Sequence, residues 1–200
     1  MSDQAEETAA EGPPIVRMGD PVLRRIATEV ADPTAPEIRG LIADMTVSLA
    51  EAGGIGLAAP QIGVGLRVIL FKVPDARATG DPDDGPCPLT ALVNPSFKPA
   101  DDEMVLGWEG CLSIPGLRGE VPRHQRIKVT GTTPEGSVFE AVLAGTRARV
   151  VQHEVDHLDG VLYLDRMTDL ARLGFAEEIM EAEAARKWLG ADAETGEQDG

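Results

Sequence analysis

The chain has 200 residues, of which 42% are hydrophobic and only 4% aromatic, and its formal net charge is −16 at pH 7. This length fits one domain with a largely aliphatic core. The acidity argues against direct binding to nucleic acid or to a membrane, because contacts to phosphates need clustered Lys and Arg, and no stretch approaches the ~20 apolar residues of a membrane-spanning helix.

Part of the acidity lies at the two ends of the chain. Eight acidic residues fall there in segments without apolar periodicity: Asp3, Glu6, Glu7, Glu11, Asp192, Glu194, Glu197 and Asp199. We therefore expect flexible, solvated tails at residues 1–14 and 190–200 and a single folded domain at residues 15–189. The leading tail has neither the basic region nor the apolar run of a signal peptide, so we expect a cytoplasmic protein.

Hydrophobic periodicity and Gly/Pro punctuation divide the domain into elements. In chain order they are a proline-led turn at 20–30, an amphipathic helix at 37–52, a glycine-dense loop at 53–65, a buried strand at 66–73, a polar and mobile loop at 75–89, strands at 91–97 and 104–114, a hairpin at 126–143, a helix at 145–157 and a final helix at 169–189. This order predicts an α+β fold, with antiparallel or mixed strands packed around the helix at 145–157 and further helices near both ends.

The segment "QHEVDHLDG", residues 152–160, places two histidines four residues apart on that helix. His153 and His157 lie one turn apart, so both imidazoles can reach one metal ion. Glu154 is displaced by about 100° around the helix, which suits a base beside the ion better than a ligand. The HExxH pattern indicates a metal site, although a helix with two surface histidines would give the same letters.

A catalytic site with three protein ligands needs one more donor. Glu177 lies downstream on the final helix, where a thermolysin-like zinc peptidase would carry its third ligand. Cys111 lies upstream in "EGCLS", at the end of an apolar, strand-like run. Spacing leaves both donors open.

Three motifs taken together resemble those of peptide deformylases. They are "GIGLAAPQ" at 54–61, "EGCLS" at 109–113 and "QHEVDHLDG" at 152–160, in that order. The resemblance covers residues 16–167. It implies an α+β fold with the HExxH helix against antiparallel strands, and an enzyme that removes the N-formyl group from formylmethionine of newly made proteins.

The resemblance also implies roles for the motif residues. The metal ligands would be Cys111, His153 and His157, with water in the open fourth position. Glu154 would be the general base and acid, while the Gln61 side-chain amide and the Leu112 backbone N–H would stabilise the oxyanion. These roles suit the chemistry, because a metal ion lowers the pKa of a bound water and two donors aimed at a developing negative charge are together worth several kcal/mol.

The methionine side chain would be bound by a further set of residues: Gly54, Ile55, Gly56 and Val150, with Arg118 near the pocket rim. The resemblance also pairs Arg123 with Asp156 and makes Glu109 a buried anchor for its loop. Thr146 and Arg147 stand where many relatives have bulkier apolar residues, which predicts an altered pocket wall. The loop at 75–89 matches no motif, and we expect its Cys87 to be a free, exposed thiol.

A Cys/His/His site accepts several divalent metals, because thiolate and imidazole suit zinc, iron(II), cobalt and nickel alike. Deformylases typically use Fe²⁺, so we expect Fe²⁺, with Zn²⁺, Ni²⁺ or Co²⁺ possible in purified protein. The expected partner is an N-formylmethionyl peptide or a nascent chain emerging from the ribosome, and the expected state is a monomer or weak dimer. The alternatives are a zinc endopeptidase using Glu177 and a non-enzymatic protein with a structural metal.

Overall fold

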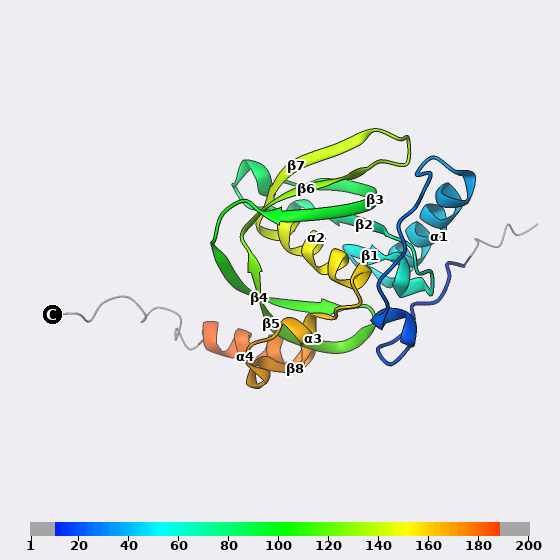
Figure 1. The fold of residues 1–200 in the computed structure, drawn as a ribbon. Coiled ribbons are helices and arrows are strands. Elements are labelled where there is room, and N and C mark those ends of the chain that lie inside the picture. The colour runs from blue at the N-terminus through cyan, green and yellow to red at the C-terminus, as the bar shows by residue number, and fades with distance from the viewer. Residues whose placement is uncertain (1–10, 189–200) are drawn as a thin grey trace, which may run out of the picture.

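Two antiparallel sheets enclose the helix α2 in the computed structural model, which describes residues 11–188 (Figure 1). The larger sheet has the order β1-β2-β3-β6-β7 and the smaller one β4-β5-β8. The strands are β1 (Gly56–Ala58), β2 (Val68–Val73), β3 (Cys87–Pro99), β4 (Met104–Cys111), β5 (Ile114–His124), β6 (Arg126–Thr132), β7 (Val138–Ala144) and β8 (Leu173–Phe175). The α-helices are α1 (Pro36–Ala52), α2 (Gly145–Leu158), α3 (Tyr163–Arg166) and α4 (Ala176–Trp188). The α+β prediction is confirmed.

Helix α1 forms as its apolar spacing predicts. The buried face of the helix packs against β1 and β2 and consists of Ile38, Leu41, Met45 and Leu49. Pro36 occupies the first turn, where a backbone N–H would have no acceptor within the helix, so its lack of an N–H costs no hydrogen bond. Gly53 ends the helix at φ 67°, a left-handed conformation that glycine adopts without strain.

The larger sheet confirms the strand at 66–73 and the hairpin at 126–143. Strand β2 is almost continuously buried, and β6 pairs with β7 from Arg126↔Ala144 to Thr132↔Val138 around a turn containing Gly136 at φ 85°. Strand β3 is longer than predicted. The glycine-dense segment at 53–65 was predicted to be a loop throughout, and this is wrong for three of its residues. They form β1, which pairs with β2 from Gly56↔Phe71 to Ala58↔Ile69.

The smaller sheet corrects two further predictions. The strand predicted at 104–114 is two strands, because the register shifts after Gly110 and the chain turns at Leu112. Strand β5 was missed: its prolines and glycines argue against a strand, but it pairs with β4 along most of its length, and this pairing outweighs local propensity. The last helix begins at Ala176, not at 169, because Leu173 turns back to pair with Gly119.

Helix α2 lies between the two sheets, against β1, β2 and β3 on one side and β5 on the other (Figure 1). Every residue from Val150 to Leu158 is buried. Its apolar side chains, including Val151 and Val155, join the core of the larger sheet. Both histidines of the HExxH segment are therefore inside the molecule, which excludes the interpretation of two surface histidines.

The loop between β2 and β3 is fastened to the start of α2. It contains two short 3₁₀ turns, η3 (Asp75–Arg77) and η4 (Pro82–Asp84). The N-cap residue of α2, Ala144, has no side-chain cap, and the buried Asp84 carboxylate accepts the Arg147 backbone N–H at 3.0 Å instead. A carboxylate at a helix N-terminus is stabilising, so this loop caps the helix that carries both histidines.

The ends of the chain fall partly outside the described residues. Ser48 of α1 donates to the Pro13 carbonyl at 2.7 Å, so residue 13 contacts the domain. The rest of the N-terminal tail before residue 11, and the tail at 190–200, lie beyond what the structure describes. Within residues 11–188, no helix is both long and apolar enough to cross a membrane.

Candidate active site

Three side chains of the ligand type converge between the sheets. Cys111 comes from the end of β4, while His153 and His157 face the same side of α2 with ring centroids 5.1 Å apart. One ligand atom from each residue lies within 4.8 Å of the other two, and Cys111 Sγ is 3.3 Å from His157 Nε2. Among the described residues this is the one cluster of three such donors. The structure thus brings together the predicted ligand set.

Glu109 fixes one of these ligands from behind. Its Oε2 lies 2.8 Å from His153 Nδ1, which leaves Nε2 of the ring to face the cluster. Glu109 also binds Arg123 through two nitrogens at 2.8 and 2.9 Å, and Arg149 at 3.0 Å. Burial would raise the pKa of Glu109, but the hydrogen bonds from Arg123 and His153 outweigh it and hold the pKa well below its usual value. Glu109, the predicted anchor of its loop, is therefore an ionised carboxylate.

The expected pair of Arg123 and Asp156 is present. Arg123 Nη1 lies 2.5 Å from Asp156 Oδ2, and both side chains are buried. Arg166 completes the group by donating to Asp156 Oδ1 at 2.7 Å. Buried charges need such partners, because an unpaired ion inside a protein is strongly destabilising. Arg123 thus joins β5 to α2 and, through Glu109, to β4.

Glu154 lies beside the cluster without a partner for one oxygen. It is 3% exposed, and its Oε2 has no hydrogen bond to the described residues. Burial raises its pKa to about 7. A carboxylate that is buried, unpaired and open to a pocket can take up and release a proton near neutral pH.

Gln61 points its amide N–H groups at the same place. Its Oε1 accepts the Ala58 backbone N–H at 2.8 Å, which directs Nε2 toward Cys111 Sγ at 3.5 Å and Ser113 Oγ at 3.3 Å. The backbone contact orients the amide group, because its oxygen must face the N–H donor. Leu112 follows Cys111 in the turn before β5 and lines the same pocket.

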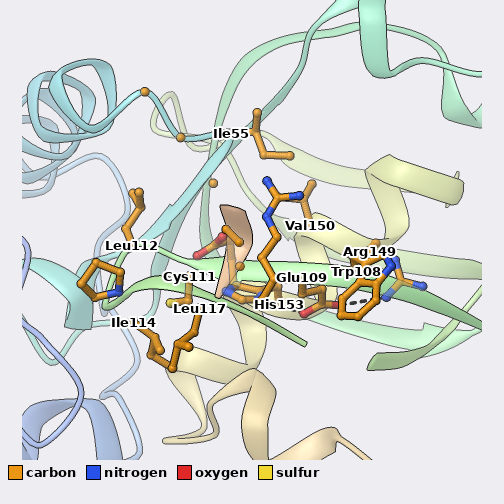
Figure 2. Close-up of a pocket in the computed structure, with 18 of the residues that line it drawn as sticks. Ile55, Trp108, Glu109, Cys111, Leu112, Ile114, Leu117, Arg149, Val150 and His153 are labelled. Carbon is orange, nitrogen blue, oxygen red and sulfur yellow. Dashed lines mark hydrogen bonds and ion pairs between the residues drawn. The ribbon is translucent and has the colours of Figure 1, made fainter. Parts of the chain in front are cut away.

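A pocket of about 630 Å³ opens onto the cluster. All five predicted substrate residues line it, namely Gly54, Ile55, Gly56, Val150 and Arg118. Figure 2 shows Cys111 and His153 in the middle of the view, with Ile55, Leu112 and Val150 around them. Gly56, the first residue of β1, must be a glycine because of the space around it: a Cβ there would meet the Glu154 carboxylate and come within 2.7 Å of Val150 Cγ2.

Glu177, the competing third ligand, lies elsewhere. It is exposed in the first turn of α4 and is not one of the three residues of the cluster. The zinc-peptidase alternative therefore loses the ligand on which it depended.

Sequence reasoning missed several neighbours of the site. Arg149 could have been found, because it precedes His153 by four residues on α2 and so shares its face; both contact Glu109. Ser113 ends the motif "EGCLS" but was given no role there, whereas Arg166 and the loop residue Arg77, which also lines the pocket, gave no signal in the sequence. Cys87, expected to be exposed, is a free thiol that is partly buried against the core.

The three residues fit a divalent metal in the chemistry of their donors. One thiolate and two imidazoles form a common catalytic set that leaves a coordination position open. The hydrogen bond from His153 to Glu109 is the carboxylate support that metal-binding histidines usually have. Together with the adjacent pocket and Glu154, the cluster and the fold define a metal-dependent hydrolase.

Comparison with known proteins gives the family. The model of the polypeptide deformylase family matches residues 13–173, and the chain belongs to this family of enzymes. Curated relatives include peptide deformylase 1 of Bordetella pertussis, 50% identical over 165 residues, which are 82% of this chain and 93% of the relative. Peptide deformylase 1 of Prochlorococcus marinus is 44% identical over 186 residues, 92% of this chain and 95% of the relative.

Solved structures agree with the sequence relatives. A class I type b peptide deformylase from Acinetobacter baumannii, bound to Met-Ala-Ser, has a TM-score of 0.72 and 36% identity, covering 80% of this chain and 100% of that one. The peptide deformylase of Thermotoga maritima has a TM-score of 0.70 and 36% identity, with the same coverage. The resemblance first noted in three motifs is thus confirmed for the fold and the family.

Proposed function

We propose that this protein hydrolyses the N-terminal formyl group of formylmethionyl peptides, releasing formate. The observation that carries the proposal is the cluster of Cys111, His153 and His157 beside Glu154, at a pocket lined by Cys111, His153 and Glu154, in a chain of the deformylase family. Its substrate in the cell is the formylated start of a newly made chain, and we place the enzyme in the cytoplasm, where such chains are made.

Cys111, His153 and His157 would hold the metal ion. We propose Fe²⁺, with zinc, nickel and cobalt as other ions that a thiolate and two imidazoles accept. A bound divalent cation lowers the pKa of water and polarises a carbonyl group. The carboxylate of Glu109 contacts His153 Nδ1, which leaves Nε2 as the ring nitrogen that would bind the ion.

Glu154 moves the proton. Glu154 lines the same pocket as Cys111 and His153, and one of its carboxylate oxygens is buried without a partner. It can therefore accept a proton from the attacking water and then donate it to the departing amine of the peptide. The same group can serve both steps because burial raises its pKa from its ordinary value to about 7.

Gln61 and Leu112 stabilise the negative charge that develops on the formyl oxygen. The Gln61 amide is oriented by Ala58 before substrate arrives, and the Leu112 backbone N–H follows the ligand Cys111 directly. Preorganised donors of this kind are each worth about 3 kcal/mol of transition-state stabilisation. Val150 and Ile55 line the pocket that receives the methionine side chain.

The test is a comparison of two peptides that differ only in the blocking group. The ferrous protein, kept free of oxygen, is given formyl-Met-Ala-Ser and acetyl-Met-Ala-Ser, and formate and free amine are measured. We expect turnover of the formyl peptide and at least about 100-fold less of the acetyl peptide, since a smaller blocking group reaches the attacking water more easily. Absence of turnover on both peptides would contradict the proposal.

A further inference from the structure

The segment from Pro74 to Pro86, here called the β2–β3 loop, is held against the pocket at several points. The Thr146 hydroxyl of α2 donates to the Arg77 carbonyl at 3.0 Å. Farther along the loop, Arg126 pairs with both Asp81 and Asp83. With the cap that Asp84 provides to α2, these contacts connect the loop to the first turn of the catalytic helix and to the start of β6. Its composition predicts a mobile loop; the structure gives it four side-chain contacts with α2 and β6.

This attachment brings Arg77 to the pocket that holds Glu154 and the metal ligands. Arg77 lines that pocket together with Thr146 and with Val150, which lies one turn farther along α2. The Arg77 side chain is exposed, and no carboxylate among the described residues pairs with it. Its backbone is fixed while its guanidinium group is available to a ligand.

Three arginines and two glutamates, Glu109 and Glu154, line the pocket, so its lining is richer in basic than in acidic side chains although the chain as a whole is acidic. The arginines are Arg77, Arg118 and Arg149, and only Arg149 is bound to a carboxylate, Glu109. The chain as a whole has a net charge of −16. Two unpaired guanidinium groups in an acidic protein create a local positive potential, which attracts negatively charged ligands.

We propose that Arg77 is a specificity-determining residue that favours peptides with an acidic side chain among the first few residues after the methionine. The inference rests on the proposed deformylase activity and names a substrate class for it. A peptide whose methionine lies in the pocket continues outward at about 3.3 Å per residue. Its following residues leave through the mouth that Arg77 borders, and a carboxylate there meets a charge-assisted hydrogen-bond donor.

The experiment measures kcat/KM on formyl-Met-Ala-Ala-Ala amide and on versions with Glu or Lys at each position after the methionine. The amide removes the terminal carboxylate, which would otherwise act as an acidic group in every peptide. The readout is the ratio of kcat/KM for the Glu peptide to that for the Lys peptide. Both peptides are measured on one sample, so any loss of folded protein cancels in the ratio.

We expect a ratio of about 5 or more at one position at low ionic strength, because an exposed ion pair changes binding by about 2- to 5-fold and the Lys peptide is repelled as well. The ratio should fall at about 0.5 M salt, which screens exposed charges. Arg77→Glu should lower it at least about 5-fold, and Arg77→Gln should give an intermediate value. The matched control is Lys128→Glu, an equal charge change at an exposed residue of β6 outside the pocket; it should leave the ratio within about 1.5-fold.

Two results would overturn the inference alone: a ratio near one at every position in the unmodified enzyme, or equal ratios in the Arg77→Glu and Lys128→Glu proteins. Failure of the unmodified enzyme to deformylate even the all-alanine peptide is a different result. It would overturn the proposed function, and this inference with it.

Discussion

Replacing Glu109 by glutamine tests whether the stability and the metal affinity of the site depend on the buried carboxylate of a residue that is not itself a metal ligand. Glu109 accepts four hydrogen bonds, two from Arg123 and one each from Arg149 and His153. Glutamine has nearly the same shape but carries no charge, and its NH₂ group would face donors where the carboxylate has an acceptor. The variant therefore leaves Arg123 buried with Asp156 as its remaining acidic partner.

The expected effect on stability follows from this burial. Removing one partner of a buried ion pair destabilises a protein by about 3–5 kcal/mol, and we take the lower value because Asp156 still pairs with Arg123. For a chain of this size, about 3 kcal/mol corresponds to a fall in Tm of roughly 6–12 °C. The carboxylate also supports His153, and losing such support weakens metal binding by about 10- to 100-fold.

A second Glu→Gln change provides the matched control. Glu120 on β5 also binds an arginine through two nitrogens, but the side chains of Glu120 and Arg172 are 21% and 38% exposed. Water screens such a pair, so Glu120→Gln should reduce stability by no more than about 1 kcal/mol and leave metal affinity unchanged. Thermal unfolding is measured with a chelator present, and metal affinity by competition with a chelator. Equal effects of the two changes would refute the reasoning.

The remaining predictions concern the metal ligands and the glycine of the pocket. Cys111→Ala should reduce the metal content from about one ion per chain to near zero, whereas Glu177→Ala should leave it unchanged, because only Cys111 belongs to the cluster. The metal content is measured by elemental analysis after dialysis. The opposite pattern would restore the zinc-peptidase alternative. Gly56→Ala should destabilise by about 1–3 kcal/mol and lower kcat/KM, because its Cβ overlaps the Glu154 carboxylate. Gly65→Ala, where a Cβ meets nothing within 4 Å, is the control in the same thermal and kinetic assays. A stable and fully active Gly56→Ala protein would show that the pocket is wider than described.

The parts of the fold that the sequence predicts are those set by local periodicity. Helix α1 shows its apolar spacing directly, and the β6–β7 hairpin shows alternation around a turn with glycine. Strand β5 contains two prolines and two glycines, and it is a strand because β4 lies beside it. Long-range pairing of this kind leaves no local signal, and the same is true of β8.

The candidate site divides in the same way. His153, Glu154 and His157 follow from helical spacing, and Cys111 from the resemblance of its motif to those of deformylases. The residues that hold the ligands in place come from separate elements, and contacts such as that between Glu109 and Arg149 are visible only in three dimensions. The β2–β3 loop is the extreme case, because its composition resembles a flexible linker while Asp84 is buried against α2.

The central claim is that Glu154 carries the proton in a reaction at the Cys111/His153/His157 site. It is tested most directly by preparing the ferrous forms of the unmodified protein and of Glu154→Gln, measuring bound iron in each, and following formate release from formyl-Met-Ala-Ser without oxygen. We predict equal iron content and a loss of kcat of at least about 100-fold in the variant, because general acid–base catalysis contributes about 10²–10⁴-fold. An iron-loaded Glu154→Gln protein with full activity would contradict the account.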